Sequence, residues 1–124
     1  MDDELVQLAT IYETPGFVLL ANDDDQTRMG CVGLRSLGTL DGTATAEIRR
    51  LFVRPDQRGQ GLGQKLLETL MERARVNGFE RLVLNTLPEM TSALALYGKL
   101  GFKPSKAHVD EPAEGTQYFS LTLD

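Results

Sequence analysis

The stretch VRPDQRGQGLGQKLLETL, residues 53–70, places three glycines and two arginines directly before and at the start of a strongly helical run. Several unrelated enzyme classes use such a loop. The first turn of a helix has unpaired N–H groups and the positive end of the helix dipole, and glycine lets an anion approach this backbone without Cβ obstruction. The stretch therefore predicts an anion site or, in a purely structural interpretation, a turn that needs glycine only for positive φ angles.

The spacing of the glycines excludes two common phosphate motifs. A dinucleotide fingerprint, GxGxxG, needs glycine where Gln64 stands, and a Walker loop needs a glycine-lysine-hydroxyl series that this stretch lacks. What remains is a strand, an RxxGxG loop at Arg58, Gly61 and Gly63, and an amphipathic helix. A loop of this size favours a diphosphate.

Just upstream of the loop, the apolar residues of a predicted strand change phase. They alternate through Ala46 and Ile48 and then return at Leu51 and Val53, one residue late. One extra residue at position 49 or 50, a β-bulge, would return them to one face, and bulges are frequent beside active sites. A strand end buried on both faces would give the same pattern, because phase then has no meaning.

Hydrophobic periodicity and turn residues predict the other elements. A short helix begins behind Asp2 and ends at residues 14–16, and a second helix runs from Leu62 to Asn77. A third helix, opened by Pro88, ends at Gly101. Strands are expected at 16–21, 28–37, 44–53, 80–86 and 116–123. Strand, helix, strand and helix in this order predict a mixed α/β sheet with an antiparallel meander and a parallel central pair.

Composition limits the class of protein. With 124 residues and 41% hydrophobic content, we expect a single domain over residues 1–124. The N-terminus MDDELVQLAT is acidic and no long uncharged apolar run follows, so we expect a cytoplasmic protein. The single cysteine, Cys31, excludes an internal disulfide and makes a metal site unexpected; a buried small hydrophobe is the favoured interpretation.

The net charge of −5 argues against nucleic acid or an anionic membrane as the main partner. Residues 49–58 nevertheless carry four arginines, Arg49, Arg50, Arg54 and Arg58, against one acidic residue, Asp56. Such a positive island favours a small anionic ligand. For Arg49 and Arg50 taken singly, solvated side chains on an exposed strand are an equal alternative.

The stretch EIRRLFVRPDQRGQGLGQKLLETLMERARVNGFERLVLNT, residues 47–86, followed by MTSALALYGKLGF, residues 90–102, resembles the GNAT superfamily of acetyl-CoA-dependent N-acetyltransferases. The RxxGxG loop carries the resemblance together with an AxxLYxxxGF pattern that begins at Ala93. The resemblance implies that the loop binds the coenzyme A pyrophosphate. It further implies a bulged strand that splays from its parallel neighbour and pairs with pantetheine, with helices on both faces of the sheet.

The resemblance implies contacts with acetyl-CoA at Leu51, Phe52, Val53, Arg58, Gly59, Gln60, Gly61, Leu62, Gly63, Gln64 and Asn85, and it implies no metal. Two departures matter. Met90 stands where the family often has asparagine, and only about 15 residues precede the first strand, where the family usually has more. We therefore expect the acceptor side to be abbreviated or completed by a second copy of the chain.

Acetyl transfer from a thioester to an amine needs a neutral amine, a polarised carbonyl and a proton for the thiolate. The resemblance implies Tyr97 as the proton donor, although a tyrosine among leucines on a helix is often core. It implies Glu47 as the base; an exposed carboxylate paired with Arg49 is the alternative. A backbone N–H of Phe52 or Val53 would polarise the carbonyl. For His108, the only histidine, a surface position is expected over a role as base.

The acceptor predicted here is a small-molecule or peptide amine, and an acidic surface is compatible with a cationic one such as a polyamine, a lysine side chain or an aminoglycoside. Two alternatives stay open at this point. One is a non-catalytic acyl-CoA sensor or interaction module, which Met90 and the short N-terminus favour. The other is a different nucleotide-binding α/β domain, which ATP or NAD would stabilise.

Overall fold

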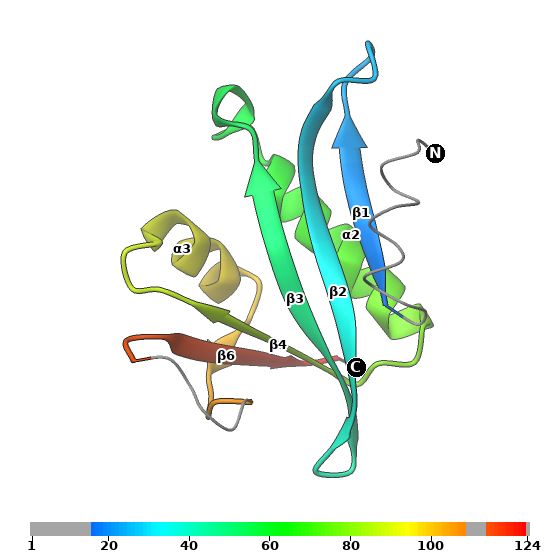
Figure 1. Cartoon of the computed structure of the whole chain (residues 1–124), viewed down its shortest axis with the longest axis vertical. Coiled ribbons are helices and arrows are strands. Elements are labelled where there is room, and N and C mark those ends of the chain that lie inside the picture. Colours follow the sequence, from blue (N-terminus) through cyan, green and yellow to red (C-terminus); the bar gives the residue numbers. More distant parts are fainter. Residues whose placement is uncertain (1–15, 109–113, 124) are drawn as a thin grey trace.

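The computed structural model describes residues 16–108 and 114–123. Within these ranges, one mixed sheet has the strand order β1-β2-β3-β4-β6-β5 (Figure 1). The strands are β1 Phe17–Asn22, β2 Arg28–Leu40, β3 Thr43–Val53, β4 Arg81–Thr86, β5 Lys103–Pro104 and β6 Gln117–Thr122. The helices are α2 Leu62–Val76 and α3 Thr91–Lys99, with a short 3-10 turn, η1, at Pro55–Gln57. The predicted N-terminal helix lies outside the described residues.

The predicted meander and the parallel central pair are confirmed. Strands β1, β2 and β3 pair antiparallel in sequence order, and β3 pairs parallel with β4. The β2–β3 turn uses positive φ angles at Asp41 and Gly42, as a tight hairpin requires. The short strand β5 and the turn η1 were not predicted, because two or three residues carry no periodicity.

The predicted start of the third helix at Pro88 is wrong. Helix α3 begins at Thr91, and the Met90 N–H donates to the Leu87 carbonyl at 3.0 Å. Pro88 is therefore the second residue of a tight turn, a position that its fixed φ suits as well as a helix start. The predicted end is confirmed, since Gly101 follows the helix with a φ of 101°.

The predicted bulge in β3 is confirmed. Arg49 pairs with Gly33 and Phe52 pairs with Cys31, so two residues of β3, Arg50 and Leu51, lie opposite a single residue of β2. Arg50 has a φ of 57°, which is uncommon for a residue with a side chain. Parallel pairing with β4 ends at Glu47 and Val83, and beyond that point the two strands separate (Figure 1).

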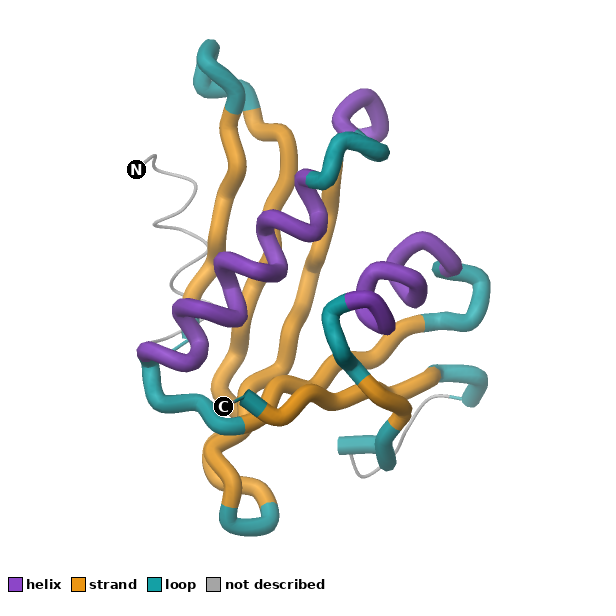
Figure 2. Tube along the Cα trace, turned by 180° about the vertical axis from the view of Figure 1, so that it is seen from behind, coloured by secondary structure: helices purple, strands orange, loops and turns teal. Residues whose placement is uncertain are grey.

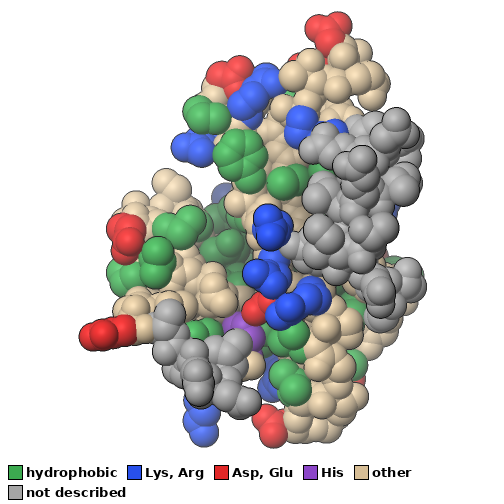
Figure 3. Space-filling model, viewed as in Figure 1, with side chains coloured by type: hydrophobic (Ala, Val, Ile, Leu, Met, Phe, Trp, Pro, Cys, Tyr) green, Lys and Arg blue, Asp and Glu red, His purple; other side chains and the backbone are tan. Residues whose placement is uncertain are grey.

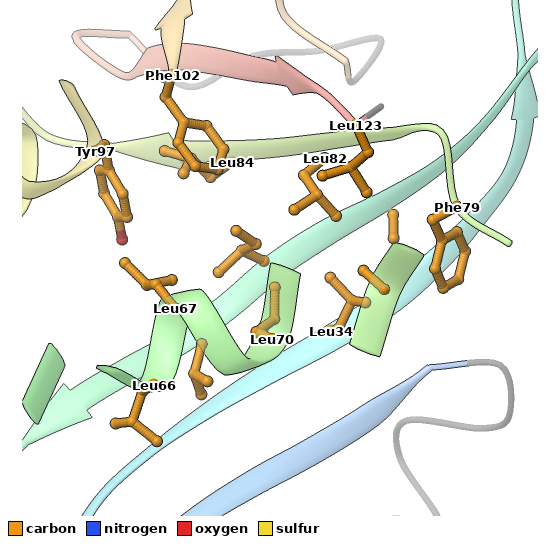
Figure 4. Close-up of a cluster of buried hydrophobic side chains, with 14 residues drawn as sticks. Leu34, Leu66, Leu67, Leu70, Phe79, Leu82, Leu84, Tyr97, Phe102 and Leu123 are labelled. Carbon is orange, nitrogen blue, oxygen red and sulfur yellow. The ribbon is translucent and has the colours of Figure 1, made fainter. Parts of the chain in front are cut away.

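The core lies between the sheet and the helices. Helix α2 crosses β1, β2 and β3 (Figure 2) and buries Leu66, Leu67, Leu70 and Ala74. Tyr97 of α3 and Phe102 belong to the same buried cluster (Figure 4). Both described helices thus share one core. Because side chains alternate along β3, Ala46 and Ile48 join this core while Glu47 points to the opposite face.

Candidate functional site

The glycine loop connects β3 to α2. Gly59 and Gly61 both have a φ of 81°, so positive φ angles are a real requirement at these positions. Gly63 differs: it has no positive φ, and a Cβ there would make an ordinary contact of 3.4 Å with Leu96 Cδ2 of α3, so the fold itself does not require glycine at this position. Gly61 directly precedes Leu62, the first residue of α2, and the Lys65 N–H donates to the Gly61 carbonyl. The preceding N–H groups therefore start the helix without an intrahelical acceptor, as an anion site needs.

A cavity of about 530 Å³ lies between this loop, the end of β3 and α3; we call it the glycine-loop cavity. Eight predicted cofactor residues line it: Leu51, Phe52, Val53, Arg58, Gly59, Gly61, Gly63 and Gln64. Three others lie elsewhere. Gln60 is exposed, Leu62 packs against the core, and Asn85 lines a neighbouring cavity. The lining is completed by Gln57 of η1, by Met90 directly before α3, and by Ser92, Ala93 and Leu96 of α3.

At the end of β3, the backbone N–H and carbonyl of Val53 point toward the side on which β4 separates from β3. The Arg54 N–H donates to Met29 of β2 at 2.8 Å, so the antiparallel alternation directs the Val53 N–H and carbonyl to the other side. The Val53 carbonyl accepts from Arg58 Nε at 3.0 Å. Arg58 thereby fixes the strand end next to the glycine loop, and of the two predicted N–H donors this geometry favours Val53.

A second cavity, of about 490 Å³, opens where β3 and β4 separate; we call it the Glu47 cavity. Its lining includes Glu47, Asn85, Thr86 and Tyr97. Leu51 and Met90 line both cavities, so the two share a wall at the bulge and at the start of α3. The two cavities are therefore direct neighbours along β3.

Glu47 is the centre of a buried polar cluster. It is only 4% exposed, so the alternative of an exposed strand carboxylate is wrong. Its Oε1 accepts from an Arg35 guanidinium nitrogen at 3.1 Å and lies 3.7 Å from Arg49 Nε, and its Oε2 lies 2.7 Å from His108 Nε2. Figure 3 shows the one histidine, in purple, beside an acidic and several basic side chains at the centre of this face.

His108 is not the surface histidine that the sequence favoured. Its side chain is 5% exposed, and its ring stands edge-on to Tyr118 with centroids 5.2 Å apart. The segment after β5 carries it across the outer face of the sheet to Glu47. The other ring nitrogen, Nδ1, is buried and has no hydrogen-bond partner in the described part of the chain.

Tyr97 is a core residue that also lines a cavity of the candidate site. It is 7% exposed and packs at a tilt on Phe102, with ring centroids 5.7 Å apart, so it is a core residue. It also lines the Glu47 cavity, and its ring reaches from α3 toward Leu67 of α2 (Figure 4). Burial raises the pKa of its hydroxyl above the ordinary value of 10.0, which keeps the hydroxyl protonated.

Sequence reasoning missed Arg35, Thr86, Met90 and Ser92 as cavity residues. Arg35 faces Glu47 directly across the β2–β3 ladder, but this register also depends on a second irregularity, between Ser36 and Gly38, that the sequence does not locate. Met90 was considered only as a departure from a pattern. It is 49% exposed, and its sulfur accepts from the Thr86 hydroxyl at 3.5 Å.

The remaining expectations concern cysteine, metal and membrane. Cys31 is half-buried, not fully buried, and its thiol donates to the Arg50 carbonyl at 3.4 Å. Among residues 16–108 and 114–123, no cluster of three or more potential His, Cys, Asp or Glu ligands is present. In the same ranges, no helix has the length and apolar character needed to span a membrane.

Comparisons with known proteins agree with this geometry. The acetyltransferase (GNAT) family matches residues 2–102. An uncharacterized N-acetyltransferase of Schizosaccharomyces pombe is 33% identical over 99% of this chain and 74% of its own length. The uncharacterized N-acetyltransferase YjgM of Escherichia coli is 33% identical over 88% of this chain and 62% of its own. A GNAT family acetyltransferase from Elizabethkingia anophelis, crystallised with acetyl-CoA bound, has a TM-score of 0.71 and 25% identity over 98% of this chain and 85% of its own.

Proposed function

Because the chain belongs to the acetyltransferase (GNAT) family and is an acetyl-CoA-dependent N-acetyltransferase, we propose that it acetylates a primary amine by direct attack in a ternary complex. The observation that carries this proposal is the shared wall of the two cavities at Leu51 and Met90. The chain is thus an enzyme and not the non-catalytic module that the sequence left open.

The pyrophosphate of acetyl-CoA binds at the start of α2, where Gly59 and Gly61 leave the backbone accessible. Unpaired N–H groups and the helix dipole stabilise its charge. Pantetheine follows the open edge of β3, where the Val53 N–H points away from β2. The thioester then lies where the two cavities meet, beside Tyr97.

The amine enters from the Glu47 cavity. Glu47 accepts a proton from the ammonium, directly or through water, while Arg35 and His108 each hold one of its carboxylate oxygens. The neutral amine attacks the carbonyl carbon, and the Val53 N–H stabilises the charge that develops on the oxygen. The C–S bond breaks as the Tyr97 hydroxyl donates its proton to the departing thiolate. The transient tyrosinate then recovers the proton that the amine nitrogen has lost.

Direct attack is favoured over an acetyl-enzyme because no cysteine lines either cavity in the described part of the chain. Cys31 directs its thiol to the Arg50 carbonyl instead. In a ternary-complex mechanism this thiol has no chemical role.

Initial-rate kinetics test the proposal. Release of the coenzyme A thiol is followed while acetyl-CoA and an amine from a broad panel are varied together, and we expect intersecting double-reciprocal lines. Cys31→Ser should retain wild-type turnover, whereas Glu47→Gln should lower kcat about 100-fold or more, as the loss of a general base does. Parallel lines, or loss of turnover in Cys31→Ser, would contradict direct attack.

A further inference from the structure

We propose that the acceptor is a small amine that carries a carboxylate, such as an α-amino acid, and that Arg50 binds this carboxylate at the mouth of the Glu47 cavity. The inference rests on the proposed function, because it requires the acceptor to occupy that cavity. This carboxylate-bearing acceptor takes the place of the cationic acceptor, with which the overall negative charge of the chain is compatible.

The first argument is the charge of the cavity lining. Three arginines, Arg35, Arg49 and Arg50, line the Glu47 cavity, and Glu47 is the only acidic residue among its lining residues. The cavity is therefore positive although the whole chain has a net charge of −5. A polyamine would meet this positive potential with each of its ammonium groups. An amino acid offers a carboxylate, which the arginines attract.

The second argument is which of the three arginines already interact with Glu47 within the fold. Arg35 hydrogen-bonds to Glu47 Oε1 at 3.1 Å, and Arg49 approaches the same oxygen at 3.7 Å. Glu47 Oε2 faces His108. For the Arg50 guanidinium there is neither a hydrogen bond nor an ion pair within the described residues. Its planar donors remain available for a carboxylate, which guanidinium groups bind in a bidentate manner.

The third argument is the backbone at Arg50. The residue is part of the β3 bulge and has a φ of 57°, a conformation that costs about 1–2 kcal/mol for a residue with a Cβ. Glycine would relieve this strain. An arginine at a strained position that lines the site, and whose guanidinium has neither a hydrogen bond nor an ion pair within the described residues, points to a role in binding.

The positive cavity also assists the reaction. Nearby positive charges disfavour the ammonium form of the acceptor and favour the neutral amine that attacks the thioester. The carboxylate anchors the acceptor, and Glu47 lies on the same strand to receive the proton. The cavity volume of about 490 Å³ lies within the range of small-molecule sites.

The experiment compares acceptors that differ only in charge. Free L-amino acids, the corresponding L-amino acid amides and putrescine are assayed with acetyl-CoA by release of the coenzyme A thiol. For the wild-type enzyme we expect at least a tenfold higher kcat/KM with the best acid than with its amide or with putrescine. Arg50→Gln should lower kcat/KM for the acid by roughly 10- to 100-fold, as loss of a charge-assisted contact does, and leave the amide and the KM for acetyl-CoA unchanged.

Two further variants make the test specific. Arg50→Gly should show the same loss of acid preference and fold at least as well, because glycine adopts the positive φ without strain. Arg73→Gln, on the exposed face of α2, should behave as wild type. If nothing turns over, the same acids and amides are titrated calorimetrically into the protein saturated with coenzyme A, where we expect the acid to bind more tightly and Arg50→Gln to remove the difference.

Several results would overturn the inference. One is that the enzyme uses or binds the acid and the amide equally well, and another is that it prefers putrescine. A third is that Arg50→Gln changes only the KM for acetyl-CoA, which would assign Arg50 to cofactor binding. Turnover without acid preference contradicts this inference alone. Acid preference in binding without any turnover contradicts the proposed function alone.

Discussion

The Tyr97 hydroxyl lies in surroundings that keep it protonated. Burial raises its pKa because the tyrosinate would lose hydration. A proton donor with a high pKa is present in the acidic form at every physiological pH, so the Tyr97 hydroxyl can hydrogen-bond to the departing thiolate and give up its proton only as the amine nitrogen loses one to the tyrosine oxygen. The same burial makes Tyr97 part of the core, so packing and catalysis favour the same residue here.

We expect Tyr97→Phe to lower kcat about 100-fold while the KM for acetyl-CoA stays nearly unchanged. The phenylalanine ring preserves the contact with Phe102, so the variant should remain folded. Steady-state kinetics and thermal unfolding measure the two effects. Unchanged turnover in a folded variant would exclude Tyr97 as the proton donor.

Glu47 and His108 also show, at the scale of single residues, that the partners of a side chain cannot be predicted from its own position in the sequence. Alternation along β3 places Glu47 on the face opposite to Ala46 and Ile48, but alternation says nothing about what covers that face. His108 covers it from a segment 61 residues away in the chain. The sequence therefore named Glu47 as a candidate and could not identify its partners.

The bulge in β3 is the element that makes the site. It offsets the strand by one residue, and the pairing of β3 with β4 ends just before it, at Glu47 and Val83. The open backbone groups of β3 and the Glu47 cavity depend on this separation, and so do the thioester position and the acceptor site that we propose. The one-residue phase slip between Ile48 and Leu51 predicted the bulge, because a strand that keeps one face buried must insert a residue to recover its phase.

The glycine loop gives a test at this scale. Gly61→Glu should abolish acetyl-CoA binding, since it adds bulk and negative charge where the pyrophosphate is proposed to lie. Isothermal calorimetry measures the affinity. Gly42→Glu in the β2–β3 turn is a matched control, because Gly42 also has a positive φ, of 77°, and lies at the opposite end of β3. Retained binding in Gly61→Glu, or equal loss in both variants, would contradict the assignment of the loop.

For the whole molecule, net charge and local charge differ in sign. The chain carries −5, yet the cavity that opens between β3 and β4 gathers three arginines around one carboxylate. Arg49 and Arg50 come from one strand and Arg35 from its neighbour, and only their packing produces the positive cavity. The overall charge of the chain therefore does not determine which class of ligand this cavity would attract.

Cofactor specificity also belongs to this scale, because a ligand that binds only the folded state stabilises the entire domain. Coenzyme A at 100 times its Kd should raise the free energy of unfolding by about 2.7 kcal/mol, whereas ATP and NAD at the same concentrations should not. Thermal shift assays measure this. Equal stabilisation by ATP or NAD would favour the nucleotide-binding alternative.

By itself, the sequence determined the mixed sheet, the bulge, helix α2 and the glycine loop. These features are local: each depends on periodicity, on positive φ angles or on the order of neighbouring elements. Only the tertiary structure decided the rest. The separation of β3 from β4, the burial of Glu47 against His108 and the positive charge of the cavity each join residues distant in the chain. Such contacts depend on register and packing, which no local pattern encodes.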